Sequence, residues 1–408
     1  MRMWVYIVRR IALLVPVLIG VMTVTFVLVQ TIPLPDRICS YYPANPRENP
    51  CSPTVSCENN PSAQCPNPAY QKAIDALGYN QPIPVQWARY IYNAFTFHWG
   101  YVSPTSTVGH GYGGLPALKG TPVTTVLAAF LPYTLELALL SLFFVLIISI
   151  PLGNLSAVNR NRPIDQGARV MSFSGYALPG FILGSLVLMA ATLWLANGSA
   201  TSPICTNSTP FLEFYGSWPQ PFCWMWGSNL TVYGYPPWLI NGYQSTPTGF
   251  PTIDAAIHGQ YWLSVDTVLR MILPALVIAY GTIALLLRFV RNSMLEVMNL
   301  DFVRTARAKG LPESQVIKKH AGRNSLNVTI TVLGLTFAFF LAGFPIIESV
   351  FNLYGVGRIF AFSLVQAAGT YDFALIFGTT ILFTYLVVAA NIIVDILYAY
   401  LDPRVRLG

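Results

Sequence analysis

Charged residues are scarce in this chain of 408 residues, since Asp, Glu, Lys and Arg together make up only 10% of it. An ordinary soluble domain has about a quarter charged residues. Hydrophobic residues make up 54% of the chain. A chain of this composition has too little polar surface to stay in solution. Composition therefore argues against a soluble protein and favours a membrane protein.

The sequence also lacks a nucleotide-binding motif. No G-x4-G-K-[ST] pattern occurs, and the glycine cluster between Gly109 and Gly120 lacks the Gly-Lys-Ser/Thr ending that cradles phosphates. No nucleophile, base and orienting group stand in a recognisable pattern, so we expect no enzymatic activity, no cofactor and no metal. The net charge is +7, but no basic patch interleaved with aromatic residues indicates nucleic-acid binding.

Cysteine is absent from every long apolar run and from the loops on one side of them. All six cysteines lie in segments 33–123 and 197–266: Cys39, Cys51, Cys57, Cys65, Cys205 and Cys223. An even count confined to one side predicts disulfides in an oxidising compartment. Zinc is the alternative, but no Cys/His spacing supports it. The simplest arrangement is Cys205 with Cys223 and two bridges among the first four, although the pairing cannot be read from the sequence.

Long apolar runs are what the chain has in abundance. A transmembrane helix needs about 20 mostly apolar residues. Six stretches meet this requirement: 8–32, 124–152, 170–196, 267–290, 328–348 and 373–400. The first run is too long for a signal peptide and has no cleavage site after it, so we interpret it as an uncleaved anchor. The sequence predicts an all-α integral membrane protein with six transmembrane helices.

The positions of Lys and Arg predict the orientation of these helices. With the N-terminus inside, most basic residues fall in cytoplasmic loops, whereas segment 197–266 has none. This asymmetry follows the positive-inside rule. We therefore expect a multi-pass protein of the plasma membrane with both termini cytoplasmic and with segments 33–123 and 197–266 outside.

One cytoplasmic loop, 292–326, has the signals of three short helices. Ser293 and Glu296 form a capping box that predicts a helix start at Met294. Asp301 can cap a second helix over 302–309, which Gly310 can end in the left-handed conformation.

The third helix of the loop would begin near Pro312 and close at Gly322. The middle helix is expected to present the small residues Thr305, Ala306 and Ala308 to a groove on a partner. A simpler interpretation is a basic loop that only touches anionic membrane lipid.

The loop resembles the EAA loop of binding-protein-dependent ABC importers. Arg304-Thr305-Ala306, three residues and then Gly310 occupy the E-A-A-x3-G frame, and RTARAKGL is typical of the dipeptide/oligopeptide permease branch, B-type. Further segments are similar to that branch in the same order: YIVRRIALLVPVLIGVMTVTFVL, TLELALLSLFFVLIISIPLG, ESVFNLYGVGRIF and NIIVDILYAYLDPRVR. The departures are Arg304 at an acidic position, Gly322 where leucine is usual, and two longer external segments.

The resemblance implies the type I ABC importer permease fold and a coupling helix that seats in an ATP-hydrolysing subunit. The contact would be made by Arg304, Thr305, Ala306, Gly310 and Leu311. The implied partners are a second homologous permease subunit, two ATP-binding subunits and an external solute-binding protein. The expected organisation is an anchor over 1–32, an external segment over 33–123, a permease domain over 124–401 and a cytoplasmic tail over 402–408.

Ionisable residues inside predicted spans are candidates for function. Glu136 lies in the second span and Glu348 at the outer end of the fifth. A paired structural charge is the alternative for Glu136, whereas Glu348 is placed where a permeation path would open outward. We therefore regard Glu348 as a candidate for shaping the gate.

The resemblance favours a permease subunit that forms half of the translocation path for short peptides. An oligosaccharide importer of the same branch is the alternative substrate class. A secondary transporter is the rival mechanism, but the expected inverted repeat is not visible. A surface receptor is a third class, for which the motif-bearing inner loop would have no use.

Overall fold

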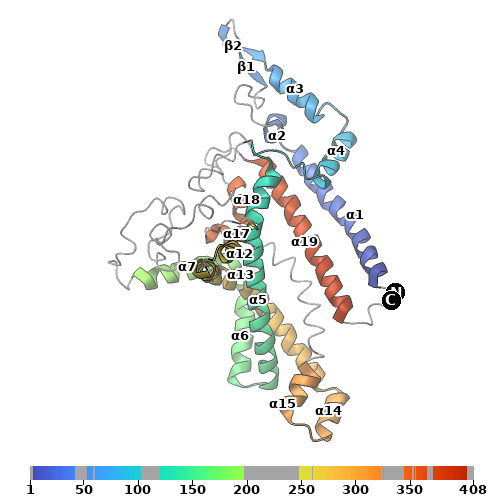
Figure 1. Ribbon diagram of the computed structural model, residues 1–408, viewed down its shortest axis with the longest axis vertical. Helices are drawn as coiled ribbons and strands as arrows, with labels where there is room; N and C mark the ends of the chain where they lie inside the picture. The colour runs from blue at the N-terminus through green and yellow to red at the C-terminus, as the bar shows by residue number, and fades with distance from the viewer. Residues whose placement is uncertain are drawn as a thin grey trace.

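The computed structural model describes residues 3–41, 53–57, 60–102, 120–196, 248–259, 261–322, 325, 344–351, 353, 355–364 and 371–401. Within these residues the protein is mostly helical, and several of the long helices lie roughly along the long axis of the molecule, whereas α7 (Gly180–Ala196) lies across it (Figure 1).

Four described helices are long and apolar enough to cross a membrane: α1 (Met3–Gln30), α5 (Val123–Val158), α13 (Tyr261–Met298) and α19 (Phe373–Leu401). They coincide with four of the six predicted spans. α19 matches its predicted span to within one residue. α1 begins, and α5 ends, several residues beyond the predicted boundary, and α13 extends beyond its predicted span at both ends.

The predicted third span is not one straight helix, which corrects the expectation for 170–196. It consists of α6 (Pro163–Ala177) and α7 (Gly180–Ala196), which meet at an angle of 108°. Between them Leu178 is extended, with φ −95° and ψ 113°. Proline disfavours the helical conformation of the residue before it and has no N–H for the helix, so Pro179 separates the two helices.

The predicted fifth span, 328–348, falls largely outside the described residues. Its described end belongs to α17 (Phe344–Val350), which is followed by α18 (Val356–Leu364). The part of the chain that the structure describes therefore contains four candidate spans, or five if α6 and α7 together make one.

The expected external segments contain short elements rather than long helices. The described ones are α2 (Leu34–Tyr41), β1 (Thr54–Cys57), β2 (Asn60–Pro66), α3 (Pro68–Leu77), α4 (Ile83–Phe95) and α12 (Pro251–Ile257). The two strands form an antiparallel ladder in which Val55 pairs with Cys65. The chain is thus not entirely α-helical, since a small hairpin lies next to the predicted cysteine cluster.

Cys65 is disulfide-bonded. Cys51, Cys205 and Cys223 lie outside the described residues, as do the side chains of Cys39 and Cys57. The disulfide prediction for the six cysteines as a set therefore stays a prediction.

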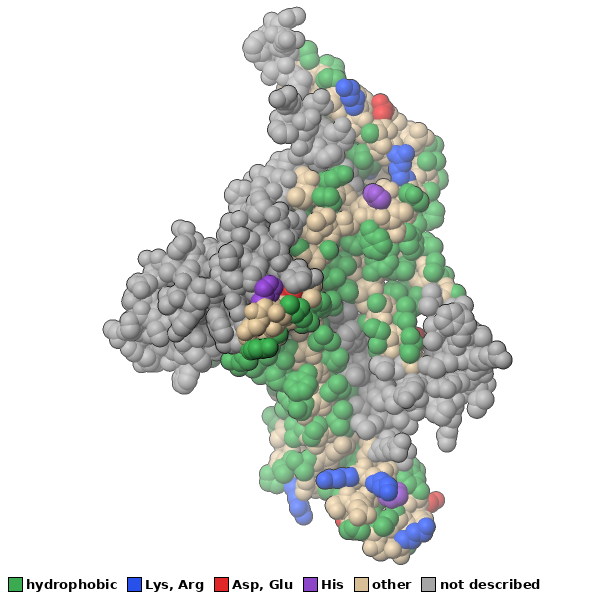
Figure 2. Space-filling model, in the orientation of Figure 1, with side chains coloured by type: hydrophobic (Ala, Val, Ile, Leu, Met, Phe, Trp, Pro, Cys, Tyr) green, Lys and Arg blue, Asp and Glu red, His purple; other side chains and the backbone are tan. Residues whose placement is uncertain are grey.

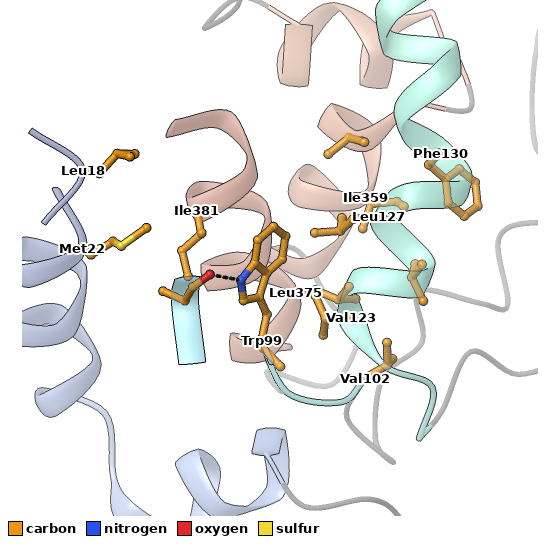
Figure 3. Close-up of a cluster of buried hydrophobic side chains, with 14 of the residues drawn as sticks. Leu18, Met22, Trp99, Val102, Val123, Leu127, Phe130, Ile359, Leu375 and Ile381 are labelled. Atoms are coloured by element: carbon orange, nitrogen blue, oxygen red, sulfur yellow. Dashed lines mark hydrogen bonds between the residues drawn. The ribbon is translucent and has the colours of Figure 1, made fainter. Parts of the chain in front are cut away.

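A large apolar cluster joins helices that are far apart in the sequence. Figure 3 shows Leu18 and Met22 of α1 on one side of it, and Leu127 and Phe130 of α5 on the other. Between them Trp99 is 5% exposed and donates a hydrogen bond from Nε1 to the Ala94 carbonyl at 3.0 Å. Side chains of α18 and α19 complete the cluster. The N-terminal helix is therefore packed into the same core as the later helices.

The two ends of the molecule differ in character. α14 and α15, from the loop after α13, lie at one end, and α2, α3 and the β-hairpin lie at the other (Figure 1). In the view of Figure 2 hydrophobic side chains dominate the surface between these ends, and basic side chains gather over the end with α14 and α15. This arrangement is that of a membrane protein with a polar unit at each end.

Candidate functional site

The loop after α13 does not begin where the capping box predicted. α13 runs without a break to Met298, so Ser293 and Glu296 lie inside it. Val290 and Met294, one helical turn apart, are both fully buried, and their packing continues the helix past the signal for a new start. Ser293 is buried instead of capping, and its Oγ donates to the Ser325 carbonyl at 3.3 Å. The hydrogen bond ties the start of the loop to its end.

The second predicted helix of the loop is present as α14 (Asp301–Ala308). Leu300 precedes it in an extended conformation, so Asp301 is its first residue rather than its cap. Gly310 has φ 75° and donates from its N–H to the Arg307 carbonyl at 2.9 Å. The left-handed turn predicted at this glycine is therefore confirmed.

The two faces of α14 differ, and Ala306, one of the three small residues expected on its exposed face, is buried. Val303 and Ala306, three residues apart, are 0% and 5% exposed. Arg304, Thr305 and Ala308 are exposed, whereas Ala306 faces inward. Phe302, one helical turn before Thr305, is 40% exposed. The EAA frame did not point to Phe302, although the inward spacing of Val303 and Ala306 leaves it on the outer face.

The third helix begins after Pro312 as one turn, α15 (Glu313–Gln315), and continues as the π-helix η2 (Val316–Ala321). Arg307 of α14 reaches across to Glu313, donating from Nε at 3.1 Å and from Nη2 at 2.6 Å. Gly322 follows η2 in the right-handed conformation, with φ −61°. This glycine therefore caps the helix without the left-handed turn seen at Gly310.

We call α14, α15 and η2 together the loop unit. The unit has its own small core, which includes the end of α5 and the end of α13: Ala157, Met294, Val303, Ala306, Val316 and Ala321. Leu311 is half-buried against this core. The loop unit is thus packed onto two membrane helices rather than hanging from them.

Glu136 does not stand alone in the apolar part of α5. Its carboxylate accepts hydrogen bonds from the Thr252 N–H and from Thr252 Oγ1, both at 3.1 Å. Thr252 lies in the first turn of α12, where helix N–H groups lack partners within the helix. Glu136 therefore fastens α12 to α5.

Glu348 is completely buried between α5 and the junction of α17 and α18. It accepts from Thr134 Oγ1 at 2.8 Å and from the Arg358 N–H at 3.1 Å. The Val356 N–H donates to Thr134 Oγ1 at 2.9 Å. A Cβ at Gly355 would clash with the carboxylate, so the glycine lets the chain pass close to it. Glu348 is therefore the centre of a buried hydrogen-bond network that joins the start of α18 to α5.

Among the described residues no group of three or more His, Cys, Asp or Glu side chains is placed to hold a metal ion.

Comparison with known proteins identifies the family. Residues 149–407, which include the loop unit, match the family described as binding-protein-dependent transport system inner membrane component. The chain is 30% identical to the oligopeptide transport system permease protein AppB of Bacillus subtilis, covering 98% of this chain and 99% of that protein. It is also 30% identical to the dipeptide transport system permease protein DppB of Escherichia coli, covering 98% of each.

A third relative, the probable D,D-dipeptide transport system permease protein DdpB of Escherichia coli, is 33% identical over 81% of this chain and 83% of its own length. The first two of these relatives match nearly the whole chain. The apolar helices, the loop unit and these matches give one conclusion: the chain belongs to the binding-protein-dependent transport system inner membrane components, as a non-catalytic, multi-pass permease subunit of the inner or plasma membrane.

Proposed function

We propose that this chain forms half of the translocation path of an ATP-driven importer and receives its motion through the loop unit. The observation that carries the proposal is the two-faced helix α14. Its inner residues, Val303 and Ala306, are buried against membrane helices, while Phe302 and Thr305 on its outer side are exposed. A force applied to the outer face is passed to packed helices instead of being lost in a mobile loop.

The partner on this face would be an ATP-binding subunit, because the chain has no phosphate-binding motif of its own. Arg304, Thr305, Gly310 and the half-buried Leu311 would surround the contact, and Ala306 would support it from within. A second, homologous permease subunit, two ATP-binding subunits and an external solute-binding protein would complete the system.

Short peptides are the substrate class that we propose. The support is the names of the relatives, which are oligopeptide and dipeptide transport proteins matched over most of their length. No described feature of this chain favours oligosaccharides.

Glu348 and Glu136 would act at the outer end of the path. Thr134 and Glu136 lie two residues apart in α5. Thr134 bonds to Glu348 of α17 and to the first residue of α18, and Glu136 bonds to α12. We propose that Glu348 shapes the outer gate by keeping the junction of α17 and α18 fixed to α5. The loop unit would face the cytoplasm, with both termini on the same side.

Co-purification tests the coupling proposal. Thr305→Arg places a large side chain on the exposed face of α14, and Ser314→Arg places the same side chain on exposed α15. Thr305→Arg is expected to reduce recovery of the ATP-binding subunits with the tagged permease by about tenfold, as for the loss of a central interface contact. Ser314→Arg is expected to leave recovery near the wild-type value. Equal recovery with both variants would show that α14 is not the docking element.

Uptake by the complete importer in vesicles tests the substrate. A labelled dipeptide or oligopeptide is expected to accumulate with ATP, and unlabelled peptides, but not oligosaccharides, are expected to compete. Competition by an oligosaccharide alone would overturn the peptide assignment while leaving the coupling proposal in place.

A further inference from the structure

Asp165 is a fully buried carboxylate at the start of α6, near the end of the molecule that carries the loop unit. Ser156 Oγ donates to Oδ1 at 2.7 Å, and the Asn161 N–H donates to Oδ2 at 2.9 Å. Arg169, one turn further along α6, donates to Oδ2 at 2.7 Å. These contacts close the turn between α5 and α6.

The strongest contact of Asp165 comes from another helix. Arg291 of α13 donates from Nε to Oδ1 at 2.6 Å and from Nη2 to Oδ2 at 3.1 Å, a two-pronged pair. The Arg291 side chain is 14% exposed, whereas that of Arg169 is 44% exposed. A planar guanidinium matches a carboxylate in both distance and direction, so the pair fixes orientation as well as position.

The pair lies at the inner end of a tightly packed group of three helices. A Cβ at Gly153 of α5 would meet Val290 of α13, and a Cβ at Gly175 of α6 would meet Ala284 of α13. Ser174 and Tyr280 add a hydrogen bond of 2.6 Å between α6 and α13. Glycine at these contacts allows the helix backbones to approach closely.

The pair between Asp165 and Arg291 lies close to the loop unit along the chain. Arg291 lies two helical turns before the end of α13, where the loop unit follows. Ser156 is the neighbour of Ala157, which lies in the core of that unit. We propose, resting on the coupling function above, that Asp165 is a positioning residue. It binds α6 to α5 and α13, so that a displacement of the loop unit moves the three helices as one body.

Transport per ATP hydrolysed tests this role in the assembled importer. Asp165→Asn removes the charge of the carboxylate with little change of volume, and Arg291→Gln replaces the guanidinium by a shorter, neutral polar group. We expect complexes that assemble and hydrolyse ATP while the peptide transported per ATP falls about fivefold, within the range for mutations along a coupling network. The double variant is expected to lose no more than the worse single variant, because the two residues act as a unit. Arg169→Gln is the control, because it removes only the more exposed contact of Asp165 and leaves the pair with Arg291 in place.

The outcomes separate the possible roles. If the variants lower only the yield or the melting temperature, and transport per ATP in the folded complex is unchanged, the pair is merely structural and the inference is wrong. If losses in the double variant add, the two residues do not act together, which also overturns it. If the unaltered chain does not retain ATP-binding subunits, the proposed function itself fails, independently of Asp165.

Discussion

Gly310 is the residue whose backbone conformation most restricts replacement in the loop unit. Its φ is 75°, and an added Cβ would meet nothing within 4 Å. Space is therefore available, and the restriction comes from the left-handed conformation. That conformation costs an ordinary residue about 1–2 kcal/mol, whereas asparagine adopts it more readily.

We predict that ATP-linked uptake falls most with Gly310→Val, less with Gly310→Ala and least with Gly310→Asn. Uptake at equal protein levels is the measurement. Equal damage by Asn and Val would show that the side chain obstructs the partner rather than straining the turn. Unchanged uptake in all three variants would contradict a coupling role for this turn.

The hydrogen-bonded site of Glu348 gives a prediction for stability. Glu348 accepts hydrogen bonds in a completely buried site. In Glu348→Gln the amide NH2 group faces a donor and leaves a buried polar group unsatisfied, which costs about 1–3 kcal/mol. We expect a lower melting temperature of the purified protein in detergent. Glu296→Gln, at an exposed position of α13, is the matched control and should change stability by no more than about 0.5 kcal/mol. Similar melting temperatures for the two variants would contradict a stabilising role for the hydrogen bonds of Glu348.

At the level of single residues, the sequence predicts best where one conformation demands one residue type. Gly310 was predictable because a helix end in the left-handed conformation favours glycine. Asp165 was not, because its partners come from three helices whose packing no local pattern reveals. The burial of Ala306 was missed because the family frame names positions without saying which side of the helix faces the core.

Among the elements, the contact between α14 and α15 depends on pH in a defined direction. The hydrogen bonds from Arg307 lower the pKa of the Glu313 carboxyl. Because the pKa of Glu313 is lowered in the folded state, the pair contributes fully to stability above the ordinary pKa of glutamate. It is lost only as the pH falls through the lowered value.

We therefore expect the contact to persist unchanged from about pH 8 to 5, since the ordinary pKa of glutamate is about 4.3. Carbon-13 NMR of the Glu313 carboxyl measures its titration, and Arg307→Gln should raise its pKa back toward the ordinary value of glutamate. Because both side chains are substantially exposed, their pair is worth no more than about 1 kcal/mol. Identical titration curves with and without Arg307 would contradict the pairing.

The helices show where sequence patterns stop being sufficient. The length of the apolar runs was enough to predict α1, α5, α13 and α19, because a helix that crosses a membrane must have a minimum length and an apolar composition. The bend at Pro179 was not predicted, because proline is also tolerated inside membrane helices and only the surrounding packing decides. The capping box at Ser293 failed for a similar reason, since burial of Met294 outweighs a local signal.

For the whole molecule, we predict that the cysteines are oxidised on one side of the membrane. Alkylation of the intact protein, followed by mass measurement, is expected to label no cysteine before reduction and all six after it. Cys65, which is disulfide-bonded, should be among those labelled only after reduction. Labelling of six thiols without reductant would contradict the prediction.

The polar contacts of α5 have a consequence for the bilayer itself. From Thr134, which donates a hydrogen bond to Glu348, to Ser156, which donates one to Asp165, the helix rises about 33 Å at 1.5 Å per residue. Between them, Ser141 and Ser149 satisfy their hydroxyls within the helix, by bonding to Leu137 and Val145 carbonyls. The spacing of the two anchors thus matches a hydrocarbon layer of about 30 Å. Lipids with much shorter or longer acyl chains would mismatch this length, pulling one anchor into the apolar layer or exposing apolar side chains to water.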